Sequence, residues 1–233
     1  LYAALDWLLE RQEGLERRLA KKHLREGGMV LYDVSSSSYE GKKCPLAKWG
    51  YNRDGNGLPG IVYGLLTNGD GCPVAVTVYE GNTGDPSTVP DQVEKVRKGF
   101  GLERVVLVGD RGMLTQAQVE KLKEYAGIGW ITALRSNQVR ELLAKGRIQR
   151  SLLDETDLAE IEAPEEFPGE RLMVCFNPLL ESERRRKREV LLEATEQGLR
   201  KIAAEAARRT KTPLGKDRIG MKVGKVLGRH CMG

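Results

Sequence analysis

The chain has 233 residues, 40% of them hydrophobic and 30% charged, which allows one large domain or two small ones. Its apolar runs are too short to cross a membrane and no signal segment opens it, so we expect a cytoplasmic protein with no membrane partner. The 4 cysteines are scattered and form no Cys-x-x-Cys pair, which argues against a zinc site or a disulfide framework.

The net charge of +5 is unevenly distributed along the chain. Residues 182–233 carry 15 basic and 6 acidic side chains, whereas residues 1–181 carry 23 and 27. This asymmetry predicts a polyanion-binding surface in the C-terminal part, next to a part that can bind cations. A basic surface that is only solvated is the alternative.

The N-terminal half begins with helical spacing and continues as strands. Leucines recur every three or four residues over 1–25, which predicts a helix that ends before Gly27 and Gly28. Short β-branched and aromatic runs then predict three strands, and an Asn-Gly-Asp-Gly turn at 68–71 predicts that the last two form a hairpin. The three strands cover residues 29–39, 61–66 and 74–79.

Helices and strands are then expected to alternate. The order is a helix over 89–96 after Asp85-Pro86, a strand over 103–110, a helix from a Thr115–Gln118 capping box to 126, and a strand over 130–134. The resulting order β-β-β-α-β-α-β predicts an α/β fold, a mixed sheet with helices on its faces. It matches the ribonuclease-H-like fold.

The C-terminal part has a weaker pattern. We expect a strand over 171–176, a long charged helix over 179–209, and another strand over 215–228, where Ile219, Met221 and Val223 alternate with other residues. The predicted domains are an N-terminal helix (1–27), a ribonuclease-H-like core (28–135), and a C-terminal α+β segment (136–233).

Two aspartates carry the strongest functional signal. Asp33 and Asp110 each follow a short apolar run, Met29–Tyr32 and Val105–Val108. A carboxylate on a buried strand is costly unless it is paired or binds a metal. Two adjacent strands could present both carboxylates to one divalent cation, which is the beginning of a phosphoryl-transfer site. The alternatives are a turn residue for Asp110 and an aspartate satisfied by backbone amides for Asp33.

The residues around both aspartates resemble those of a known family. Leu31–Ser36, followed by Tyr39-Glu40-Gly41, resembles the first acidic motif of DDE transposases from bacterial insertion sequences, closest to the IS-four-like group. Residues 106–113 resemble the second acidic motif. Further similar stretches lie at 44–55, 71–75, 80–86, 168–171 and 220–228, so the resemblance covers nearly the whole chain.

This resemblance implies that Asp33 and Asp110 are catalytic residues that bind Mg²⁺ or Mn²⁺. It also implies double-stranded DNA as substrate and self-association of the intact parent protein. The third acid should be a glutamate in a Tyr-x-x-Arg-x-x-x-Glu-like motif, which we do not find. We therefore expect it beyond Gly233, in a chain that is truncated and begins at Leu1 without its true start.

The basic run in the predicted long helix is the candidate DNA-binding element. It consists of Arg184, Arg185, Arg186, Lys187 and Arg188, which could neutralise phosphates. Arg111 could neutralise phosphate charge near the carboxylates or pair with an acidic neighbour. The few aromatic residues do not interleave with basic ones in a way that predicts single-strand stacking.

Other functions were weighed against this one. A catalytically inactive DNA-binding or dimerising remnant is the main alternative. A phosphatase with Asp33 as nucleophile is disfavoured, because Ser35 stands where that chemistry usually has a second acid. Serine hydrolysis is disfavoured because no Gly-x-Ser-x-Gly elbow is present, and the histidines, His23 and His230, are in poor contexts.

Overall fold

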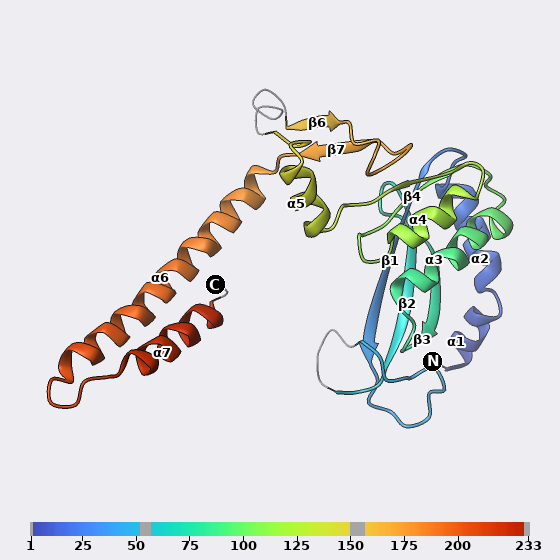
Figure 1. The fold of residues 1–233 in the computed structure, drawn as a ribbon. Helices are drawn as coiled ribbons and strands as arrows, with labels where there is room; N and C mark the ends of the chain where they lie inside the picture. The colour runs from blue at the N-terminus through green and yellow to red at the C-terminus, as the bar shows by residue number, and fades with distance from the viewer. Residues whose placement is uncertain (1, 52–56, 150–156, 231–233) are drawn as a thin grey trace. The chain divides into compact units, whose positions relative to one another are not determined.

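A computed structural model describes residues 2–51, 57–149 and 157–230 and divides the chain into two units, 1–139 and 140–233 (Figure 1). The elements of the first unit are α1 (Tyr2–Leu9), α2 (Gln12–His23), β1 (Met29–Ser38), β2 (Gly60–Asn68), β3 (Pro73–Glu80), α3 (Asp85–Glu94), the π-helix η1 (Lys95–Gly99), β4 (Val105–Val108), α4 (Gln116–Lys123) and β5 (Ile128–Ile131). Helix α5 (Ser136–Ala144) crosses the boundary, and the second unit continues with β6 (Leu158–Ile161), β7 (Leu172–Cys175), α6 (Pro178–Arg208) and α7 (Lys216–Arg229).

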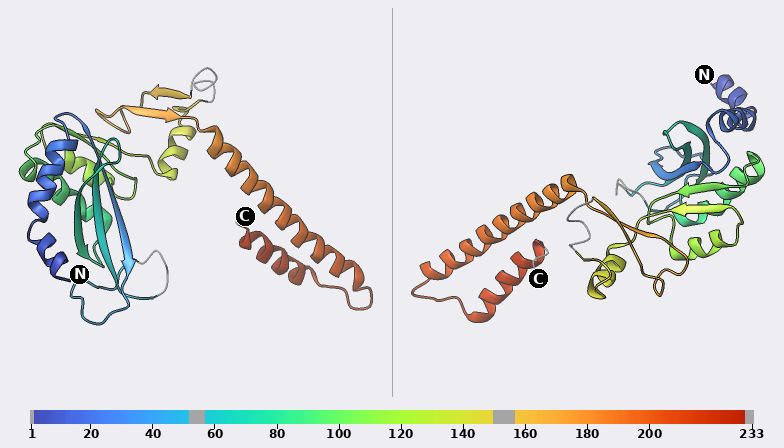
Figure 2. Two further views of the ribbon diagram at one scale, coloured as in Figure 1. Left: turned by 180° about the vertical axis from the view of Figure 1, so that it is seen from behind. Right: turned by 90° about the horizontal axis from the view of Figure 1, so that it is seen from above.

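The first unit is built on a five-stranded mixed sheet in the order β3-β2-β1-β4-β5. Strands β1, β2 and β3 form an antiparallel meander, whereas β4 pairs in parallel with β1 and with β5. The predicted order β-β-β-α-β-α-β and the mixed sheet are therefore confirmed. Figure 2 shows the sheet from behind and from above.

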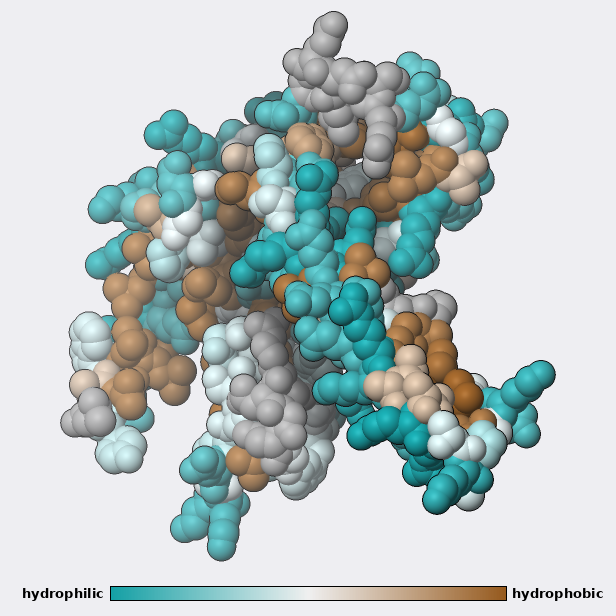
Figure 3. All heavy atoms as spheres, turned by 90° about the vertical axis from the view of Figure 1, so that its left-hand side faces the viewer, coloured by the Kyte–Doolittle hydropathy of each residue, from teal (hydrophilic) through white to brown (hydrophobic). Residues whose placement is uncertain are grey.

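The core lies on one face of this sheet. Side chains alternate along β1, so Val30, Tyr32 and Val34 are buried on the face that α2, α3 and α4 cover. Residues that point to the opposite face stay largely exposed, among them Leu65, Val76, Val78 and Ile131. In a space-filling view, hydrophobic side chains reach the surface in several separate patches (Figure 3).

The hairpin between β2 and β3 forms where the turn residues predicted it. Asn68 Oδ1 accepts hydrogen bonds from the backbone N–H of Asp70 at 3.0 Å and of Cys72 at 2.8 Å. Gly71 has a φ of +81°, which glycine adopts without the strain that a side chain would cause. This local chemistry sets the register of the two strands.

The predicted strand over 215–228 is wrong, because these residues form the helix α7. Ile219, Met221 and Val223 alternate as in a strand, but Ile219, Val223 and Val226 also follow the spacing of one helix face, so packing decides the outcome. A Cβ added to Gly198 of α6 would lie 2.8 Å from Val226, and Lys222 pairs with Glu205 of α6. These contacts fix the segment as the second arm of a helical hairpin.

Three smaller differences are local. The helix predicted over 1–25 is two helices in the described residues, α1 and α2, separated at Glu10 and Arg11. Thr115 precedes α4 without a side-chain capping bond, so the expected capping box does not form. Helix α5 and strand β6 were not predicted.

Within the described ranges, no helix is long and apolar enough to cross a membrane.

Candidate metal-binding and DNA-binding sites

Asp33 lies in the middle of β1, on the face of the sheet opposite the core. Its neighbours Tyr32 and Val34 are buried, and alternation along the strand places Asp33 on the other side. Asp33 is exposed there. The strand is thus buried on one face only, and the carboxylate keeps its solvation without a buried partner.

Asp110 lies two residues beyond the end of β4. The parallel register pairs Leu31 of β1 with Val108 of β4, so two further residues along each strand lead to Asp33 and Asp110. Asp110 Oδ1 accepts the backbone N–H of Gly112 at 2.9 Å and of Met113 at 2.7 Å. Both bonds use the same oxygen, so they orient the carboxylate while Oδ2 can still bind a cation.

The fold therefore brings the two aspartates to neighbouring strands. Such strands lie about 4.8 Å apart, a spacing at which two carboxylates on one face can share a divalent cation. In the described part of the chain, no group of three or more His, Cys, Asp or Glu side chains is arranged to hold a metal ion. The carboxylates of Asp33 and Asp110 therefore suit Mg²⁺ or Mn²⁺ but make up only part of the ligand set of such a site.

Two arginines flank the turn after β4. Arg135 Nε donates to the backbone oxygen of Arg111 at 3.4 Å, and both residues are exposed. This bond tethers the segment after β5 to the residue that follows Asp110. Arg135 was not among the functional residues predicted from the sequence. Its place just after the last parallel strand could have indicated it, because parallel strands end at the same edge of a sheet.

Two tyrosines occupy the core side of the sheet near Asp33. Tyr79 Oη donates to Asp91 Oδ2 at 2.8 Å and accepts from Gln92 Nε2 at 2.7 Å. Burial is the main cause that raises the pKa of both Tyr32 and Tyr79 above the ordinary 10. Both phenols therefore stay protonated near neutral pH and serve the packing of the sheet.

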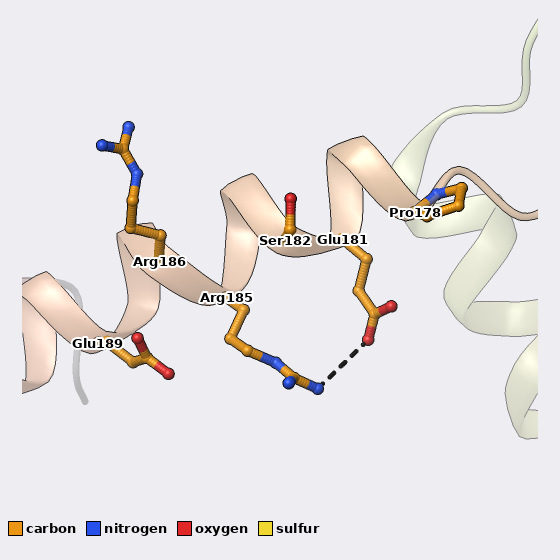
Figure 4. A pocket seen from close by; sticks show the side chains of 6 residues that line it. All are labelled: Pro178, Glu181, Ser182, Arg185, Arg186 and Glu189. Carbon is orange, nitrogen blue, oxygen red and sulfur yellow. Dashed lines mark ion pairs between the residues drawn. The ribbon is translucent and has the colours of Figure 1, made fainter.

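The predicted basic run lies on the exposed first half of α6 and does not form one cluster. Successive helical residues turn by about 100°, so five in a row surround the helix. Arg185 and Arg186 point to different sides in Figure 4, with Arg185 toward Glu181. Arg185 pairs with Glu181 at 3.6 Å and Lys187 with Glu183 at 2.7 Å, both as i,i+4 pairs.

Arg184 and Arg188 share one side of α6, since they are one helical turn apart. They line a shallow hollow together with Phe176 and Leu180. No ion pair joins either arginine to another side chain within the described ranges. These two guanidinium groups are therefore better placed for an external anion than the paired Arg185 and Lys187.

The mixed α/β sheet thus carries Asp33 on β1 and Asp110 two residues beyond β4, and a basic run lies on α6. The model of the transposase DDE domain family matches residues 26–209, so the chain belongs to that family. The family implies a transposase function and a DNA substrate. No curated protein and no solved structure matches the chain significantly.

Some predicted features lie outside the described residues. They are Arg53, Asp54 and Gly55 of the family-like stretch after Asp33, and Cys231 near the end of the chain. The residues of the candidate sites that the structure describes are Asp33, Asp110, Arg111, Arg135 and the basic run of α6.

Proposed function

We propose that residues 28–135 are the ribonuclease-H-like core of a transposase from the IS-four-like group of insertion sequences. The strand order, with an antiparallel meander followed by two parallel strands, supports this proposal. The observation that carries it is the register that leads to Asp33 and Asp110 on neighbouring parallel strands. Residues 136–233 would then be the insertion.

Asp33 and Asp110 would hold Mg²⁺ or Mn²⁺. Divalent cations bound there would activate the attacking oxygen and stabilise the leaving oxygen in phosphodiester hydrolysis and strand transfer. The chain contributes orientation, because the turn at Gly112 and Met113 fixes one oxygen of Asp110. Arg111 and Arg135, beside this turn, would neutralise the charge of the phosphate.

The basic run of α6 would hold duplex DNA through its phosphates, without reading sequence. Arg184 and Arg188 would contribute most, because Arg185 and Lys187 are already paired within the helix. Binding of this kind weakens steeply as the salt concentration rises.

A catalytically inactive DNA-binding or dimerising remnant is the second candidate. It is favoured by one observation, that no third acidic residue joins Asp33 and Asp110 in the described part of the chain. The two candidates differ in metal binding, since a remnant has no need to retain a cation site.

Titration with Mn²⁺ separates these candidates. For the catalytic core we expect the 233-residue chain to bind Mn²⁺, and Asp33→Asn or Asp110→Asn to weaken binding at least tenfold, roughly the effect of losing one important ligand interaction. Asp6→Asn on the exposed helix α1 is the matched control and should bind as the wild type does. Equal binding by all four proteins would remove the assignment.

Cleavage gives the second test. Because no third acid joins Asp33 and Asp110 within the described ranges, we expect no measurable nicking of supercoiled plasmid by this chain in Mg²⁺ or Mn²⁺. Metal-dependent nicking that Asp33→Asn abolishes would show that the third acid lies within these residues.

A further inference from the structure

The loop between β1 and β2 exposes two aromatic side chains. Trp49 is 70% and Tyr51 86% exposed, far more than most large apolar side chains of a folded protein. They lie in the segment that leaves β1 at Ser38, five residues beyond Asp33 on the same strand, or about 17 Å along it. The loop is therefore within reach of a DNA strand bound at the carboxylates.

The backbone of this loop is held by the sheet. Lys48 and Gly60 exchange two hydrogen bonds, at 3.1 and 2.9 Å, in an antiparallel bridge to the first residue of β2. The N–H of Gly81, just after β3, donates to Leu46 O at 2.9 Å. The exposed aromatics thus stand on a segment that is bonded to two strands.

Two glycines make this close attachment possible. A Cβ at Gly81 would lie 1.9 Å from Gly60 O and 2.7 Å from Lys48 O, both backbone atoms that cannot move aside easily. A Cβ at Gly50 would lie 2.2 Å from Gly81 O. Gly50 separates Trp49 from Tyr51, so the backbone between the two rings is pinned against the sheet.

The charges around the rings favour a polyanion. Residues 39–51 contain three lysines (Lys42, Lys43 and Lys48) and one acid, Glu40. Lys42 and Lys43 are exposed, whereas Lys48 lies 3.9 Å from Glu80. Exposed rings on a loop that also carries exposed lysines suit an unpaired nucleic acid strand, in which bases offer flat faces and phosphates offer negative charge.

We propose that the loop 39–51 binds unpaired bases of a DNA strand, with Trp49 and Tyr51 stacked on bases and Lys42 and Lys43 at phosphates. The proposal rests on DNA being the substrate and adds a preference for unpaired DNA ends or junctions.

The test compares two labelled probes by fluorescence anisotropy with the full chain. One probe is a blunt duplex and the other is the same duplex with a short unpaired 3′ extension. We expect the extended probe to bind at least about tenfold more tightly, as two stacked bases would give. Trp49→Ala/Tyr51→Ala should bind both probes equally, and Lys42→Gln/Lys43→Gln should flatten the salt dependence.

The double variant Tyr2→Ala/Trp7→Ala is the matched control, because it removes one exposed tyrosine and one exposed tryptophan from α1. It should keep the wild-type preference. A second measurement uses Trp7→Phe/Trp130→Phe, which leaves Trp49 as the single tryptophan, and its fluorescence should be quenched by the extended probe.

Three results would overturn the proposal. The wild type could bind both probes equally, or the control variant could lose the preference as fully as the loop variant. Alternatively, Trp49→Ala/Tyr51→Ala could change only self-association, which would assign the loop to contact with a second copy of the chain. If the wild type binds the duplex but shows no preference for the extended probe, this inference alone is refuted. Absence of binding to any DNA also refutes the DNA-binding part of the proposed function.

Discussion

Helix α2 closes the exposed edge of the sheet with side chains, and this contact gives a stability prediction. Gln12 Nε2 donates to Val76 O at 2.8 Å, and Glu16 Oε1 accepts the Val76 N–H at 3.1 Å. Lys95 Nζ lies 3.2 Å from the second oxygen of Glu16 and 2.8 Å from Thr77 Oγ1. Gln12 and Glu16 thus occupy the backbone C=O and N–H of Val76, which an additional strand would use, so they protect the edge of β3.

The Glu16→Ala variant should lose about 3 kcal/mol of unfolding free energy. Breaking a buried ion pair by removing one partner costs about 3–5 kcal/mol. We use about 2 kcal/mol here, because the Lys95 side chain is 23% exposed and keeps its hydrogen bond to Thr77 Oγ1. The unpaired Val76 N–H adds about 1 kcal/mol. Glu16→Gln/Lys95→Met removes both charges and keeps an acceptor for Val76, so it should stay within about 1 kcal/mol of the wild type.

Urea unfolding followed by tryptophan fluorescence measures these changes. Trp130 packs against the core of the first unit, so Trp7→Phe/Trp49→Phe is a suitable background that leaves it as the reporter. The transition midpoint should fall in Glu16→Ala at an unchanged slope. The reasoning is refuted if Glu16→Ala costs less than about 1 kcal/mol, or if the charge-free double variant is as unstable as Glu16→Ala.

Three further outcomes are expected. Gly81→Ala should destabilise the first unit by about 3 kcal/mol, because the new methyl group would collide with Gly60 O. Gly84→Ala, whose Cβ would meet only Pro86 Cδ at an ordinary 4.0 Å, should change little in the same urea assay. For duplex DNA, Arg184→Gln/Arg188→Gln should reduce the slope of log affinity against log salt concentration by about two, and Arg185→Gln/Lys187→Gln should reduce it less. Equal slopes in all proteins would mean that the basic run is only a solvated surface. Lys222 holds the pKa of Glu205 below its ordinary 4.5, so this pair stabilises the α6–α7 hairpin fully above pH 4.5 and the contribution is lost as the pH falls through the lowered value. In Glu205→Gln, circular dichroism should show that this acid dependence is gone.

The elements that the sequence predicted correctly depend on local chemistry. The Asn68–Gly71 turn carries its own capping bonds, and Val105–Val108 is a β-branched-rich run that suits a strand at any position of the sheet. The order of these elements then constrains which strands can be neighbours. That order brings β1 beside β4, with Asp33 on β1 and Asp110 two residues beyond the end of β4.

The features that the sequence did not predict depend on contacts between distant residues. Ile219 and Val223 fit both the strand and the helix period, whereas Val226 fits only the helix period, and α7 packs on Gly198 as a helix. The five consecutive basic residues read as one cluster, although the helix distributes them around its axis and pairs two of them. Trp49 stands exposed because Gly50 meets Gly81, a contact between residues far apart in the chain.

The central claim is that Asp33 and Asp110 share one divalent cation. Crystals of the 233-residue chain soaked in Mn²⁺ and measured at a wavelength with strong manganese anomalous scattering test it most directly. The account predicts an anomalous peak within coordinating distance, about 2.0–2.3 Å, of an oxygen from each carboxylate. Carboxylates on opposite faces of the sheet, or a peak that neither aspartate contacts, would contradict it.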